Sequence, residues 1–210
     1  LAALAISMLA IAGFTPDGKI AGLTAFGQAI YLSPLKWVVM LAPLAFIMLF
    51  SFKAENMSAA AARTMFFVFA AVMGVSMSSI LVVFTGASVV RVFFITAAAF
   101  GALSLVGYTT KKSLSGMGSF LIMGLIGLVI ASVVNLFLAS SALSFGISVI
   151  GVLVFAGLTA WDTQRLKEMY LYSELGPEEA AKLSVNGALS LYLNFINMFQ
   201  MLLSLFGDRR

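Results

Sequence analysis

Apolar residues along this chain gather into long runs that short polar connectors separate. A helix needs about 20 apolar residues to cross the hydrocarbon core of a bilayer. The pattern therefore predicts seven membrane-spanning helices, at residues 1–14, 35–52, 64–84, 92–108, 117–138, 142–161 and 187–206. The first run is too short as it stands, and we interpret it as a helix whose start precedes Leu1 rather than as a cleaved signal sequence.

The connectors predict how these helices follow one another. Only residues 139–141 separate the fifth run from the sixth, so these two helices should be antiparallel neighbours. Residues 15–19 form a turn cluster, and residues 20–33 predict an extended loop or an interfacial helix. Pro43 should kink the second helix. The longest connector, residues 163–184, is charged and is broken before Pro177, which is well placed to start a short helix.

Composition supports a membrane protein and excludes several other classes. Of 210 residues, 62% are hydrophobic and 10% are charged, too apolar a balance for a soluble domain. The basic residues are scattered over the connectors, which does not indicate nucleic-acid binding. Without cysteine or histidine, the chain lacks thiolate chemistry and the commonest transition-metal ligand. No nucleophile–base pair or phosphate loop appears, so we expect that the protein is not an enzyme. The apolar runs predict a single all-α membrane domain over residues 1–210.

The basic residues also predict an orientation. Seven spans would place seven basic residues on one face and five on the other, which favours a cytoplasmic N-terminus. The first face would hold Lys53, Arg63, Lys111, Lys112, Arg165, Lys167 and Lys182. If the last segment enters and returns, Arg209 and Arg210 join this face, and the bias becomes nine against three.

Asp162 is the most informative residue, because it directly follows the apolar run 142–161. A carboxylate near the centre of a bilayer costs roughly 2.5–3.5 kcal/mol and would need a compensating role, whereas one at the edge costs little. Asp162 is therefore either an ion or proton site or a plain helix-end carboxylate. Glu55 is the other acid that lies near the edge of a predicted span.

A polar stripe runs along the last predicted helix. Ser190, Asn194 and Asn197 recur at spacings of three and four, together with Gly187, Met201 and Ser204, and so share one helix face. Such a stripe either joins neighbouring helices by hydrogen bonds or lines a polar pathway.

Two arginines are candidate partners for Asp162. Arg63 lies at the start of the third predicted helix, where it either anchors the helix in the headgroups or reaches inward to Asp162. Arg165 lies three residues after Asp162 and could pair with it along the same helix.

Several strings of this chain resemble one known family. FAGLTAWDTQRLKEMY and GALSLYLNFINMFQMLLSLFG resemble the C-terminal signature of the Bax inhibitor-1 family, in its bacterial inner-membrane branch, and MGVSMSSI and TGASVVRVFF resemble the same branch. The resemblance covers nearly the whole chain from about residue 57. It implies a multi-pass inner-membrane bundle of seven helices with the last one central. It also implies a pH-sensitive calcium leak that depends on two aspartates sharing a proton near an arginine.

Asp162 matches the first of these two aspartates, and Arg63 lies close to the family's arginine. The second aspartate falls in the family's LYLDF string, which here reads LYLNF, so Asn194 replaces it. Two carboxylates in contact repel each other and therefore share a proton, which an acid and an amide do not. We expect this protein to respond less to pH between about 6 and 8 than relatives with both acids.

The sequence thus favours a cation leak pathway in which Asp162 is the ion-binding or gating carboxylate. Ser190, Asn194 and Asn197 would add neutral oxygen ligands for calcium, the transported ion rather than a cofactor. The alternative is a non-conducting regulator that binds a membrane quality-control protease or other membrane proteins. A proton-coupled transporter is the third interpretation.

Overall fold

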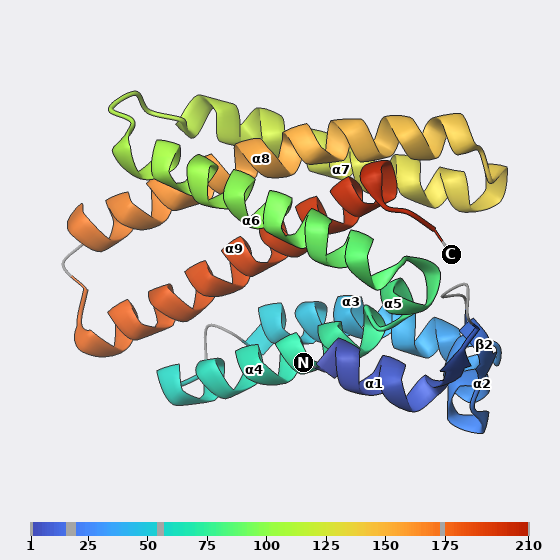
Figure 1. The fold of residues 1–210 in the computed structure, drawn as a ribbon. Helices are drawn as coiled ribbons and strands as arrows, with labels where there is room; N and C mark the ends of the chain where they lie inside the picture. Colours follow the sequence, from blue (N-terminus) through green and yellow to red (C-terminus); the bar gives the residue numbers. More distant parts are fainter. Residues whose placement is uncertain (1, 16–19, 54–56, 173–174, 210) are drawn as a thin grey trace. The chain divides into compact units, whose positions relative to one another are not determined.

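The computed structural model describes residues 2–15, 20–53, 57–172 and 175–209 (Figure 1). The chain divides into two compact units. The first comprises Leu1–Val89 with Asp208–Arg210, and the second comprises Val90–Gly207. Each unit is described separately below, and the expected single domain stays a prediction.

The first unit begins with a helix and a hairpin where we expected one spanning helix. Helix α1 (Ala2–Ala10) ends at Ala10, and strand β1 (Ile11–Phe14) pairs antiparallel with β2 (Ile20–Leu23). The prediction of a helix over residues 1–14 is therefore wrong for its last four residues. The Thr24 side chain explains the end of α1, because it donates a hydrogen bond to the Leu9 carbonyl at 2.8 Å and also accepts one from Gly27 N. Most of the predicted turn cluster, residues 16–19, lies outside the described residues.

The rest of the first unit is helical. The structure resolves the choice left open for residues 20–33 into β2 followed by a short helix, α2 (Ala25–Tyr31). Helix α3 (Leu35–Lys53) continues through Pro43, and the 61° bend of this region lies earlier, between α2 and α3. The third predicted span is broken into α4 (Ala59–Ser76) and α5 (Ser79–Val83). At this break the Ser78 hydroxyl donates to the Val75 carbonyl at 2.6 Å and competes with regular helix bonding.

The second unit contains the rest of α6 (Gly86–Thr109), from Val90 onward, and three long helices: α7 (Ser115–Leu138), α8 (Ser141–Tyr172) and α9 (Pro177–Phe206). Helices α7 and α8 are antiparallel neighbours, as predicted (Figure 1). Ala139 turns the chain between them with a left-handed φ of 48°. The Asn135 side chain fixes the turn, because it accepts from Ser140 N at 3.0 Å and donates to Ser144 Oγ at 2.7 Å.

The predicted connector 163–184 is mostly helical, which corrects the sequence prediction. Helix α8 has 32 residues and α9 has 30, so each extends about 45–48 Å, well beyond the roughly 30 Å of a hydrocarbon core. The polar and charged residues that suggested a connector include strong helix formers such as Gln164, Arg165 and Lys167. Pro177 starts a helix, as predicted, but that helix is the whole of α9.

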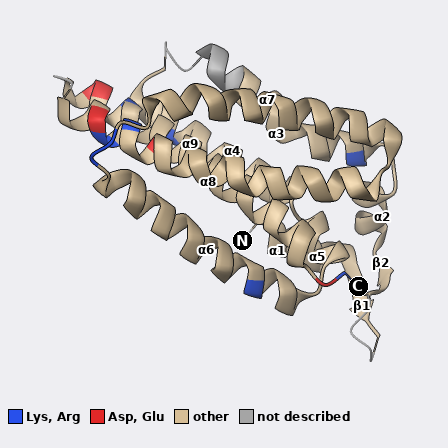
Figure 2. Ribbon diagram, turned by 90° about the horizontal axis from the view of Figure 1, so that it is seen from above, with Lys and Arg blue, Asp and Glu red and all other residues tan. Residues whose placement is uncertain are grey.

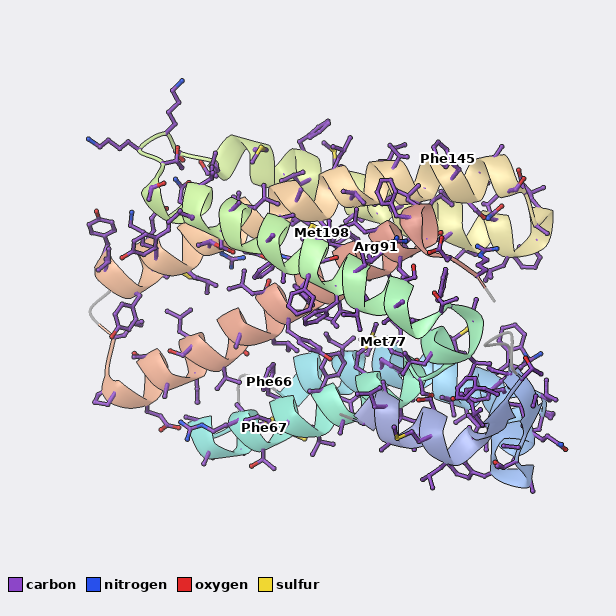
Figure 3. The ribbon with its side chains drawn as sticks, viewed as in Figure 1. Phe66, Phe67, Met77, Arg91, Phe145 and Met198 are labelled. Carbon is purple, nitrogen blue, oxygen red and sulfur yellow. The ribbon has the colours of Figure 1, made fainter. Side chains whose placement is uncertain are left out.

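Helix α9 packs against two helices of its unit. Gly187 allows the Leu166 side chain of α8 to pack closely against α9, since a Cβ there would lie 2.6 Å from Leu166 Cδ2. On the α6 side, the Phe195 ring lies 5.6 Å from the Phe93 ring and 5.5 Å from the Phe100 ring, between centroids. Met198 of α9, labelled in Figure 3, is 1% exposed. Enclosure of α9 by all the other helices stays a prediction.

The all-α, multi-pass class is confirmed. Among the described residues, five helical stretches are long and apolar enough to cross a membrane: Ala59–Val83, α6, α7, α8 and α9. The bent pair of α2 and α3 would make a sixth. The remaining predicted span, at the start of the chain, consists of the short helix α1 followed by strand β1 of the hairpin. Apolar side chains such as Phe145 of α8, 64% exposed, cover the outside of these helices (Figure 3).

Two glycines of α6 provide a matched test of helix packing in the second unit. A Cβ on Gly107 would lie 2.2 Å from the Ala160 carbonyl oxygen, whereas a Cβ on Gly101 would meet nothing within 4 Å. We expect Gly107→Ala to destabilise the protein by about 1–3 kcal/mol, because backbone must move to admit the methyl group. Gly101→Ala should be neutral or slightly stabilising. Thermal unfolding in detergent measures both, and equal effects of the two substitutions would contradict this packing.

Candidate ion site around Asp162

Asp162 lies inside helix α8 and not at its end, because the helix continues to Tyr172. The residue is 6% exposed. The interpretation of Asp162 as a plain helix-end carboxylate is therefore wrong. A buried carboxylate needs hydrogen-bond partners, because its desolvation is costly.

Those partners come from the polar face of α9. Asp162 Oδ2 accepts one hydrogen bond from Ser190 Oγ at 2.6 Å and one from Asn194 Nδ2 at 2.7 Å. Ser190 and Asn194 lie four residues apart on one helix face, which lets both reach the same oxygen. Asn194 is itself 6% exposed. The structure thus brings together three of the residues that the sequence singled out.

Asn197, the third member of the predicted stripe, bonds within its own helix. Its Nδ2 donates to the Leu193 carbonyl at 2.8 Å. It nevertheless lines the same cavity as Asp162. Its side-chain oxygen is not used in that bond and remains able to accept a hydrogen bond or a cation.

The cavity beside Asp162 has a volume of about 640 Å³. Most of its wall is apolar and comes from α7 and α8, including Leu125, Leu128, Phe155 and Leu158. Its polar lining comprises Asp162, Arg165, Ser190, Asn194, Asn197 and Ser132. Because both hydrogen bonds described for the carboxylate end on Oδ2, Oδ1 is left to bind a ligand from this cavity.

Arg165 does not pair with Asp162 in the described structure, and the expected pairing of Arg63 is not tested. Arg165 lines the cavity, but its guanidinium carbon lies 5.4 Å from the centroid of the Trp161 ring, and the partners described for Asp162 are the α9 side chains. Within the described residues, the expected Arg165–Asp162 ion pair is therefore replaced by cation–π stacking on Trp161. Arg63 belongs to α4 in the first unit, and its pairing with Asp162 stays a prediction. Glu55 lies outside the described residues.

Sequence reasoning missed Gln164, which is 5% exposed and supports the site from α8. Its Oε1 accepts from Leu114 N at 2.7 Å, and its Nε2 donates to the Lys112 carbonyl at 2.9 Å. It thereby ties the part of α8 next to Asp162 to the connector between α6 and α7. In the sequence, only its position two residues after Asp162 could have drawn attention to Gln164. Its partners are backbone groups, which cannot be recognised from residue types.

Comparison with known proteins identifies a family that matches nearly the whole chain and relatives that match about three quarters of it. Residues 2–210 match the model of a family described as "Inhibitor of apoptosis-promoting Bax1". The chain is 50% identical over 165 residues to an uncharacterised protein of Caulobacter vibrioides, covering 78% of this chain and 66% of the relative. It is 51% identical over 155 residues to an uncharacterised protein of Rickettsia prowazekii, covering 74% and 65%.

A further relative is the Escherichia coli inner membrane protein YbhL, which is 47% identical over 165 residues, 78% of this chain and 70% of the relative. The matched region thus spans about two thirds of the length of these relatives. The relative's location, together with the long apolar helices, agrees with the predicted multi-pass inner-membrane protein.

The hydrogen bonds of Asp162 predict a difference between two substitutions. Asp162→Ala leaves the Ser190 hydroxyl and the Asn194 amide without their acceptor, and we expect a loss of about 1–3 kcal/mol in the free energy of unfolding. Asp162→Asn retains a side-chain oxygen and should cost less. Glu168→Ala, at an exposed position of the same helix, should change stability by no more than about 0.5 kcal/mol. Reversible unfolding in detergent gives these values, and equal stability of Asp162→Ala and the unmodified protein would contradict the described bonds.

Proposed function

Because this chain belongs to the Bax inhibitor family, we propose that it provides a cation leak pathway across the inner membrane, conducts calcium and catalyses no reaction. Asp162 is the ion-binding or gating carboxylate of this pathway. The observation that carries the proposal is the burial of Asp162 against Ser190 and Asn194 beside a large cavity.

The charge of the site supports a cation. The two groups that donate to Asp162 are neutral, so they stabilise a negative charge without cancelling it. The apolar wall of the cavity strengthens the attraction of that charge for an ion, because it lowers the local dielectric constant. Arg165 at the cavity is exposed, and its charge is screened by solvent more than a buried charge would be.

The ligand set supports permeation rather than storage. Calcium prefers six to eight oxygen ligands. Asp162 supplies the only carboxylate of the described cavity lining, and Ser190, Asn194 and Asn197 add neutral oxygens. Water would complete the coordination shell. Such a site would bind calcium weakly, and a conducting pathway needs binding that is weak enough for the ion to leave.

The direct test is calcium flux into liposomes that contain the purified protein. We expect Asp162→Asn to reduce flux at least tenfold while the protein stays folded, because the amide removes the charge and keeps the shape. Glu168→Gln is the matched control, since it removes an exposed carboxylate six residues further along α8 and should leave flux unchanged. Flux that is unchanged in well-folded Asp162→Asn would contradict the proposal and favour the non-conducting regulator.

The contact between Asn194 and Asp162 predicts that Asn194→Asp makes calcium flux depend on pH. Asn194 Nδ2 lies 2.7 Å from Asp162 Oδ2, so Asn194→Asp would place two carboxylate oxygens in contact, where they must share a proton. At low pH the shared proton holds α8 and α9 together. As pH rises, loss of that proton makes the two charges repel each other and loosens the contact.

We therefore expect flux through Asn194→Asp to rise steeply with pH between about 6 and 8, and flux through the unmodified protein to vary little over that range. Calcium flux against pH for both forms is the measurement, with Glu168→Gln as the control because Glu168 is exposed and lies outside the described cavity lining. A steep transition near neutral pH in the unmodified protein would contradict this argument.

A further inference from the structure

We propose that the second unit holds an anionic phospholipid where α6, α8 and α9 meet, with the lipid phosphate at Lys167. The proposal does not depend on conduction through the Asp162 site. It rests on a second cavity, on the depth of that cavity in the membrane and on the arrangement of the lysine.

The cavity has a volume of about 520 Å³ and lies between the extended ends of α8 and α9. Figure 1 shows these helix ends separating toward the connector that joins them. Its lining combines Lys167, Tyr108 and Tyr170 with the aliphatic side chains of Leu166, Leu183 and Leu191. None of the described residues that line it is acidic. A cation and two tyrosines above an aliphatic wall match a lipid that has an anionic headgroup and an apolar chain.

The depth of the cavity agrees with a headgroup. The apolar run of α8 ends at Trp161, and Lys167 follows about 9 Å further along the helix, at 1.5 Å per residue. Tyr108 lies in the last turn of α6, and Tyr170 lies in the last turn of α8. Tryptophan and tyrosine concentrate where hydrocarbon meets water. This end of the unit therefore lies at the level of the phosphates.

Lys167 is held in position for a phosphate. Its Nζ donates to the Tyr108 carbonyl at 2.7 Å and lies 4.9 Å from the centroid of the Tyr108 ring. An ammonium group has three N–H donors, so two remain for phosphate oxygens. The hydroxyls of Thr163 and Ser184 donate to carbonyls of their own helices, and the lysine is the charged donor among the described residues that line the cavity. Because the side chain is already ordered, binding loses little conformational entropy.

The surrounding charge favours an anionic lipid over a neutral one. Lys111 and Lys112 lie on the connector between α6 and α7, and Arg165 and Lys182 lie on α8 and α9. Figure 2 shows basic residues gathered at one end of these helices, together with acidic ones. Basic pockets between transmembrane helices are typical sites for anionic headgroups. Acidic residues such as Glu168 also lie on these helices, but none of those that the structure describes lines the cavity. A soluble phosphate would leave the aliphatic wall unfilled, which favours the lipid.

Native mass spectrometry of the detergent-purified protein tests the proposal. The protein is mixed with phosphatidylglycerol, phosphatidylcholine or glycerol 3-phosphate, and bound ligand is counted. We expect one phosphatidylglycerol to be retained in preference to phosphatidylcholine, and no retention of glycerol 3-phosphate. Lys167→Gln should weaken phosphatidylglycerol binding about fivefold, the effect of one lysine at a membrane surface.

Two variants separate the cavity from general surface charge. Lys112→Gln removes an exposed lysine outside the cavity and should retain the lipid. Ala188→Phe fills the cavity from α9 while all charges stay, and it should displace the lipid. Melting temperatures without lipid show which variants are folded. Loss of the bond to Tyr108 could unfold Lys167→Gln, and in that case Ala188→Phe still tests the site.

Three results would overturn the proposal. Equal retention of phosphatidylcholine would show that the charge plays no part. Equal loss of binding in Lys112→Gln and Lys167→Gln would assign the effect to the charged surface as a whole. Retention of glycerol 3-phosphate at the level of phosphatidylglycerol would identify a soluble phosphate as the ligand.

Discussion

The hydrogen bonds between Asp162 and helix α9 are the constraint on which the second unit depends. A carboxylate that is 6% exposed needs donors, and Ser190 and Asn194 supply them from one face of α9. These bonds fix the register of α9 against α8, because a rotation of either helix would leave the carboxylate unpaired. The close approach at Gly187 and the ring contacts of Phe195 with α6 are compatible with that single register. Packing and site geometry are therefore set by the same helix face.

The two proposed sites use different sides of α8. Asp162 and Lys167 are five residues apart, and at 3.6 residues per turn their side chains project about 140° apart around the helix. Asp162 faces a cavity bounded by α7 and α9, and Lys167 faces one bounded by α6 and α9. The length of α8 makes both possible, because the helix extends beyond the hydrocarbon core into the headgroups. A lipid at Lys167 and an ion at Asp162 would thus contact one rigid helix without competing for space.

Much of this arrangement could be predicted from the sequence. The apolar runs predicted the helices of the second unit, and the spacing of Ser190 and Asn194 predicted the face of α9 that contacts Asp162. Helix ends were less predictable, because charged residues after Trp161 resemble a connector although they favour helix. Gln164 could not be found, because it bonds to backbone groups that every residue carries. The hairpin after α1 was not predicted either, because a short run of apolar residues fits a strand as well as the end of a helix.

The central claim is that the carboxylate of Asp162 binds the permeating cation. Infrared difference spectroscopy with isotope-labelled aspartate observes this group directly, since the chain has only three aspartates, Asp17, Asp162 and Asp208. Adding calcium to the reconstituted protein should shift a carboxylate stretching band, and that shift should disappear in Asp162→Asn and persist in Asp208→Asn. A spectrum that calcium leaves unchanged, or a shift that survives in Asp162→Asn, would contradict the claim.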